Sequence, residues 1–192
     1  MTYRTIQPPF TLEFHKMPKD ELRAYYRWFV DQIPERIAEL ERAVQETPGF
    51  ERWQADATPS SLDALGEWFV GQVDTRPRAP EELAELKRDL PYPIDIEPND
   101  LTNRTFSLAM DVGMYLSQVL ITNVPALRWE HPLGSPNFAE YGQPVLRGSG
   151  RVPLNPVGVL VALAYGIARK TKSGGRLREL YDIWSRKLAA VD

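Results

Sequence analysis

Apolar side chains lie on nearly every side of residues 101–121 when this segment is drawn as a helix. A surface helix carries one apolar stripe, whereas a helix that is apolar all round belongs in the interior of a domain. The segment is too short, and too often interrupted by polar residues such as Asp111, to span a bilayer. Pro125 ends the pattern, and the chain then continues extended over residues 127–129. The sequence therefore predicts a central buried helix that leads into a strand.

Apolar residues three and four positions apart predict further helices with one buried face each. These helices begin at or near Pro18, Thr58, Pro80, Asn155 and Leu177. In the first of them Pro34 lacks the N–H that a regular helix needs, so we expect a break or a kink there. In the third, Leu83, Leu86 and Leu90 should face inward. The segment after Pro34 has an outer side that should be solvated, which carries Glu35, Arg36, Glu39, Glu41 and Arg42.

Three segments should be extended. Residues 1–17 contain two consecutive prolines and an alternation of apolar and polar side chains, which predicts an N-terminal arm packed on the domain. The prolines between residues 90 and 98 disfavour helix in the residues before them. Turn signals around Gly134 and Gly142 predict a small antiparallel sheet of two or three strands within 127–148. We expect a loop over residues 75–80.

A chain of 192 residues suits one domain with a sizeable core. Hydrophobic residues make up 43% and charged residues 26%, close to the globular average, so wholesale disorder is not expected. No repeat or linker divides the chain. The prediction is one α+β domain over residues 1–192, mainly helical, with the sheet of 127–148 packed on the helix of about 101–121.

Charge and cysteine content narrow the function classes. With a net charge of -3, the chain lacks the excess of basic residues that is typical of proteins that bind nucleic acids in general. The absence of cysteine excludes disulfides, thiolate nucleophiles and cysteine-ligated metals. No basic segment followed by an apolar run is visible at the N-terminus, so we expect a cytoplasmic protein without a membrane segment. Neither a cofactor motif nor metal-ligand spacing is present, so no cofactor or metal is predicted.

Asp111 is the residue of greatest chemical interest, because it interrupts an apolar helix. A buried carboxylate without a partner costs several kcal/mol, about the desolvation penalty of a single ion. One interpretation is a buried hydrogen-bond anchor to a tyrosine, an arginine or a backbone N–H. The alternatives are a functional carboxylate in a cleft and simple exposure to solvent.

Glu130 and His131 follow the predicted strand at 127–129 and are weaker candidates. A histidine beside an acid could serve as a base or a metal ligand, but the only other histidine is His15 and no ligand spacing accompanies it. The serines in glycine-rich loops lack the frame of a nucleophile elbow.

One basic cluster surrounds the turn at Gly174 and consists of Arg169, Lys170, Lys172, Arg176 and Arg178. Positive charge at the C-terminal end of a helix offsets the helix dipole, which is the simpler interpretation. Contact with an anion or a nucleic acid is the other. The aromatic residues fall mostly on predicted inner faces, which is typical of a core.

Four segments form a pattern: residues 25–29 and 32–37 (YYRWF and QIPERI), residues 110–116 (MDVGMYL) and residues 127–129 (LRW). In these segments the chain resembles a group of uncharacterised bacterial proteins of about 190 residues. The resemblance implies a shared fold and a bacterial source, and no activity. The group pattern has Gly-Glu where this chain has Ser117-Gln118.

The sequence favours a non-enzymatic protein that acts by binding another protein, for example an immunity-type inhibitor of a bacterial toxin. The alternative is an enzyme whose carboxylates converge in the fold, in a pocket that gathers Asp111, Glu130 or His131.

Overall fold

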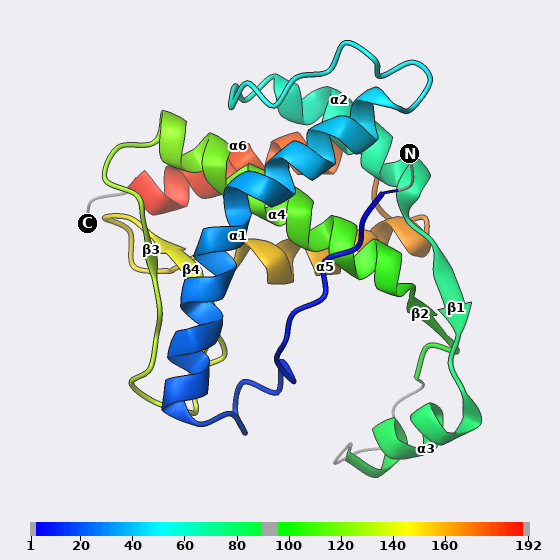
Figure 1. The fold of residues 1–192 in the computed structure, drawn as a ribbon, viewed down its shortest axis with the longest axis vertical. Helices are drawn as coiled ribbons and strands as arrows, with labels where there is room; N and C mark the ends of the chain where they lie inside the picture. Colours follow the sequence, from blue (N-terminus) through cyan, green and yellow to red (C-terminus); the bar gives the residue numbers. More distant parts are fainter. Residues whose placement is uncertain (1–2, 90–95, 190–192) are drawn as a thin grey trace.

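The computed structural model describes residues 3–89 and 96–189 (Figure 1). In these ranges it has six helices: α1 (Lys19–Gln45), α2 (Ser61–Gln72), α3 (Pro80–Asp89), α4 (Asn103–Asn123), α5 (Pro156–Ala168) and α6 (Gly175–Ala189). The strands in the same ranges are β1 (Thr75–Pro77), β2 (Asn99–Leu101), β3 (Arg128–Glu130) and β4 (Val145–Arg147). The predicted class is confirmed: the protein is a mainly helical α+β domain.

α4 is the central helix that the apolar pattern predicts. Thr102 caps its first turn by accepting a hydrogen bond from the N–H of Thr105. From Ser107 to Ser117 every residue is buried, because α4 packs against α1 and α5 and also meets α2 and α6. Figure 1 shows α4 crossing the middle of the molecule with other helices on several sides. A helix with neighbours all round leaves no face for solvent, which explains its continuous apolar sequence.

α1 is one helix of 27 residues and is not broken at Pro34. It changes direction partway along its length in Figure 1, as the missing N–H of an internal proline predicts. Leu22, Phe29 and Leu40 lie on its fully buried face. The alternative of a complete break was wrong, because the helix continues through Pro34 as far as Gln45.

The predicted sheet within 127–148 is present as the antiparallel pair β3–β4, in which Trp129 lies opposite Leu146. It has two strands, because residues 138–141 form turns. A second antiparallel pair joins β1 to β2, and β1 lies within residues 75–80, for which a loop was expected. The predicted extended segment of 90–98 lies largely outside the described residues.

The predicted N-terminal arm contains neither helix nor strand over residues 3–17. Phe10 and Phe14 pack edge-on against Tyr25 of α1, with ring centroids 5.4 and 5.1 Å apart. The arm therefore completes a second group of buried side chains around the first half of α1.

Two glycines allow α2 to approach the turn before α6. A Cβ atom added to Gly66 would lie 2.2 Å from the carbonyl oxygen of Gly174. Such a distance is far inside van der Waals contact, so only glycine fits at this crossing.

Candidate functional site

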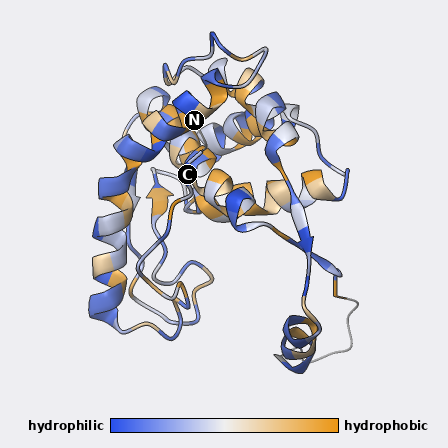
Figure 2. Ribbon diagram, turned by 45° about the vertical axis from the view of Figure 1, so that its right-hand side comes forward, coloured by the Kyte–Doolittle hydropathy of each residue, from blue (hydrophilic) through white to orange (hydrophobic). Residues whose placement is uncertain are grey.

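α3 is the clearest exception to the predicted core. Leu83 and Leu86 were expected to face inward, and this was wrong for Leu86, which is 39% exposed. Leu83 is half-buried, and no described side chain of α3 is fully buried. Figures 1 and 2 both show α3 standing away from the other helices at the end of β1 and β2. Leu90 lies outside the described residues. We call β1, α3 and β2 together the α3 projection.

The base of the α3 projection is held by polar contacts that also reach α5. β1 and β2 pair over three residues, with Arg76 opposite Asp100. The Arg78 side chain donates to the Asp100 carboxylate at 2.8 Å, and the Tyr165 hydroxyl of α5 donates to it at 2.5 Å. The Asp100 and Arg78 side chains are only 13% and 15% exposed, so these contacts are well shielded from water.

Charges are distributed unevenly along α3. Glu81 and Glu82 lie in its first turn, and Glu85 follows one turn later. Arg76 donates two hydrogen bonds of 2.8 Å to Glu82, and the N–H of Ala79 donates a third. The hydrogen bonds from Arg76 and Ala79 lower the pKa of Glu82 to about 2. The face that carries Leu83 and Leu86 therefore has carboxylates along one side.

Two residues of the basic cluster predicted around Gly174, Lys172 and Arg176, line an apolar groove between α5 and α6. The groove has a volume of about 180 Å³ and is lined by Val159, Ala162, Leu163, Lys172, Arg176 and Leu180. Lys172 is exposed, and its backbone N–H donates to the carbonyl of Gly166 at 3.2 Å. Arg176 pairs with Glu179 on the same helix at 2.7 Å. The basic side chains thus border apolar surface as well as helix ends.

Asp111 is fully buried and serves as a hydrogen-bond anchor. Arg36 donates to both of its carboxylate oxygens, with Nε–Oδ1 at 2.9 Å and Nη2–Oδ2 at 2.7 Å. The Tyr3 hydroxyl donates to Oδ2 at 2.5 Å. Arg36 was expected on the solvated side of its helix, and this was wrong, because its guanidinium turns inward to satisfy Asp111.

The same cluster attaches the N-terminal arm to the core. Arg36 also donates to the backbone carbonyl of Arg4 at 2.8 Å, and the N–H of Ile6 donates to Ser107 of α4 at 2.7 Å. Burial raises the pKa of Tyr3 well above its ordinary value, as does the charge of Asp111, so its hydroxyl stays a donor. Burial also raises the pKa of Asp111, and the hydrogen bonds and charge of Arg36 oppose that rise.

Glu130 and His131 have partners of their own and do not join Asp111. Glu130 pairs with Arg128 at 2.7 Å and with Arg147 of β4 at 2.8 Å, so it links the two strands. His131 stacks on Tyr26 of α1 with ring centroids 4.8 Å apart, and its Nε2 lies 3.2 Å from the Gly142 carbonyl. None of these contacts among described residues brings the three candidates into one pocket.

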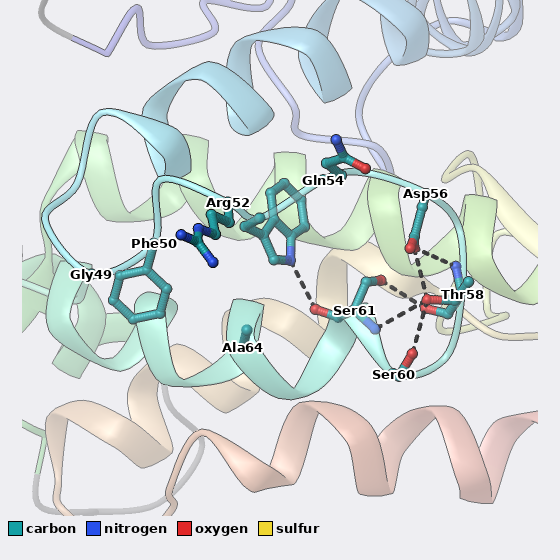
Figure 3. Close-up of a pocket in the computed structure, with 10 residues that line it drawn as sticks. Gly49, Phe50, Arg52, Gln54, Asp56, Thr58, Ser60, Ser61 and Ala64 are labelled. Carbon is teal, nitrogen blue, oxygen red and sulfur yellow. Dashed lines mark hydrogen bonds between the residues drawn. The ribbon is translucent and has the colours of Figure 1, made fainter.

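A larger pocket of about 400 Å³ lies between the loop of residues 49–60 and the start of α2 (Figure 3). Its hydroxyl groups are engaged with one another and with Asp56, which accepts hydrogen bonds from the N–H and the hydroxyl of Thr58. Ser61 lies 2.6 Å from the Tyr115 hydroxyl. These contacts hold the loop in place. The pocket contains neither of the two histidines, so no imidazole lies beside its hydroxyl groups.

Over residues 3–89 and 96–189, no group of three or more histidine or acidic side chains could hold a metal ion. No helix within those same ranges is long and apolar enough to cross a membrane. Comparison with protein-family models, curated proteins and solved structures gives no match. The candidate site therefore rests on the geometry of this chain, and the α3 projection is the feature that the core does not explain.

Proposed function

We propose that this protein acts by binding another polypeptide, and that the α3 projection is its contact surface. The observation that supports the proposal is a helix with no buried side chain among those described, at the end of a hydrogen-bonded base. A ten-residue helix is marginal in water when it stands alone, so most helices of this length gain stability by burying a face. On the leucine face of α3, Leu86 is 39% exposed and Leu83 is half-buried.

A single exposed leucine is ordinary and would support nothing. The α3 projection differs because two leucines share one face and because Arg78, Asp100 and Tyr165 fix the direction in which the helix extends. A helix presented on a rigid base reaches its partner with little ordering cost, which favours association.

The test is site-specific photo-cross-linking in cells that produce the protein. A photoreactive phenylalanine analogue replaces Leu86 in one variant and Val152, which is 56% exposed, in the control. We expect a discrete cross-linked species from position 86 and none from position 152. Equal labelling at both positions, or no product at position 86, would contradict the proposal.

A further inference from the structure

We infer that α3 of one molecule docks into the α5–α6 groove of a second copy of this chain, so that two molecules exchange their α3 projections reciprocally. This inference rests on the proposed function and names the partner. It joins the two surface features that the monomer leaves without a role: an apolar helix face with acidic neighbours and an apolar groove with basic neighbours.

The groove has the chemistry to receive such a helix. Leu163 and Leu180 form its buried floor, and Val159 and Ala162 reach the surface on α5. Lys172 stands on one side of this floor and is exposed. A leucine side chain that enters the groove leaves water for apolar surroundings, which is the main favourable term in protein association.

α3 carries the complementary groups. Leu83 and Leu86 are three residues apart and project from one face, as neighbours on a helix do. Glu82 and Glu85 lie along the adjoining side. With the leucines in the groove, Glu85 comes near the lysine at its edge. Complementary charge at the rim sets orientation and raises the rate of association.

α3 does not fill the α5–α6 groove of its own molecule. The paired strands β1 and β2 hold α3 away from α5 and α6 in both views of the molecule (Figures 1 and 2).

Reciprocity supplies the contact area that one short helix lacks. Stable interfaces bury on the order of 800 Å² on each partner, more than one face of a ten-residue helix offers. A two-fold exchange uses the helix and the groove of each molecule, so every contact occurs twice. This closed arrangement is the commonest symmetry of soluble oligomers.

The experiment measures mass in solution by light scattering after size-exclusion chromatography. The wild type is expected to be dimeric, and the dimer should weaken as salt screens the rim charges. Glu85→Lys and Lys172→Glu should each be largely monomeric, because each places like charges at both contacts. Asp31→Lys reverses an exposed acidic residue of α1 and should leave the dimer intact.

Mixing the two single variants gives the decisive result. In a mixed dimer, the lysine introduced at position 85 of one chain meets the glutamate introduced at position 172 of the other. The second contact keeps the native pair of Glu85 and Lys172, so dimers should reappear.

Three outcomes would count against the inference. A wild type that stays monomeric up to its solubility limit would overturn it. If position 86 still cross-links to a protein of another mass, the proposed function survives and only the second-copy partner fails. Dimers that persist in both single variants would equally exclude this groove.

Discussion

Arg36 and Asp111 lie on different helices and form a two-pronged ion pair in the core, with N–O distances of 2.9 and 2.7 Å. Their side chains are 3% and 0% exposed. The pair joins α1 to α4, and through Tyr3 and the Arg4 carbonyl it also joins the N-terminal arm. Three parts of the chain thus depend on one carboxylate.

Asp111→Asn should destabilise the protein, because an amide supplies one acceptor oxygen, whereas Arg36 donates to both carboxylate oxygens and Tyr3 to one of them. Breaking a hydrogen bond to a buried group costs about 1–3 kcal/mol. Asp111→Leu removes both acceptor oxygens and leaves the buried guanidinium without its counter-charge, so its cost should be about 3–5 kcal/mol. Urea unfolding measures both values.

The double variant Arg36→Met, Asp111→Leu is the control for this prediction. It replaces both charges with apolar groups and should recover much of the stability that Asp111→Leu loses, since exchanging a whole buried pair is often near neutral. A melting temperature of Asp111→Asn within one degree or so of the wild type would contradict the anchor. The face of α4 around Asp111 would then be the first place to search for a ligand.

Gly66→Ala should destabilise the packing of α2 on α6. The new methyl group would lie 2.2 Å from the Gly174 carbonyl oxygen, and backbone cannot yield as a flexible side chain can. Overpacking of this kind costs about 1–3 kcal/mol. Gly71→Ala is the matched control on the same helix, since nothing lies within 4 Å of the added atom. The control should be stabilised by up to about 1 kcal/mol in thermal unfolding.

His131 makes stability depend on pH. Burial lowers its pKa below the usual 6.5, the charge of Arg23 acts in the same direction, and the hydrogen bond with Gly142 opposes them. Below pH 6.5 the unfolded chain therefore binds a proton that the folded protein resists, so stability falls as the pH falls.

The measurement compares the wild type with His131→Gln in denaturant unfolding at a series of pH values. The other titrating groups are common to both proteins, so the difference between their free energies of unfolding reports on the histidine alone. The free energy of unfolding of the wild type, relative to that of His131→Gln, should decrease as the pH falls from about 7.5 to about 5. This is the range in which histidine changes its charge. If the relative free energy of unfolding of the wild type instead increased as the pH fell, the folded protein would prefer the charged ring.

The sequence predicted elements whose signal is local. α4 and α5 are marked by continuous apolar runs and by the caps Thr102 and Asn155, and both helices appear within a few residues of the expected bounds. The β3–β4 pair follows from turn signals between two short apolar segments. These elements can be predicted from residues that are neighbours in the sequence.

The remainder depends on contacts between residues far apart in the chain. Arg36 and Asp111 are separated by 75 positions, so nothing beside Arg36 shows that it turns inward. The strands β1 and β2 have three residues each and no alternation of apolar and polar side chains. Their pairing joins residues that lie far apart in the sequence. The leucines of α3 follow the spacing of a buried face, which predicts an inner side without saying which molecule covers it.

Asp100→Asn should loosen the α3 projection without unfolding the domain. The amide has one acceptor oxygen, whereas Arg78 and Tyr165 now donate to different oxygens of the carboxylate. The change also removes the negative charge that holds the guanidinium. Hydrogen–deuterium exchange should become several-fold faster at the amides of residues 81–88 and stay unchanged within α4, because local opening is governed by local contacts. Asp31→Asn, an exposed acidic residue of α1, should leave both regions unchanged. Faster exchange throughout the core would mean that Asp100 supports the whole fold, and no change in α3 would mean that β1 and β2 fix the helix by their backbone pairing alone.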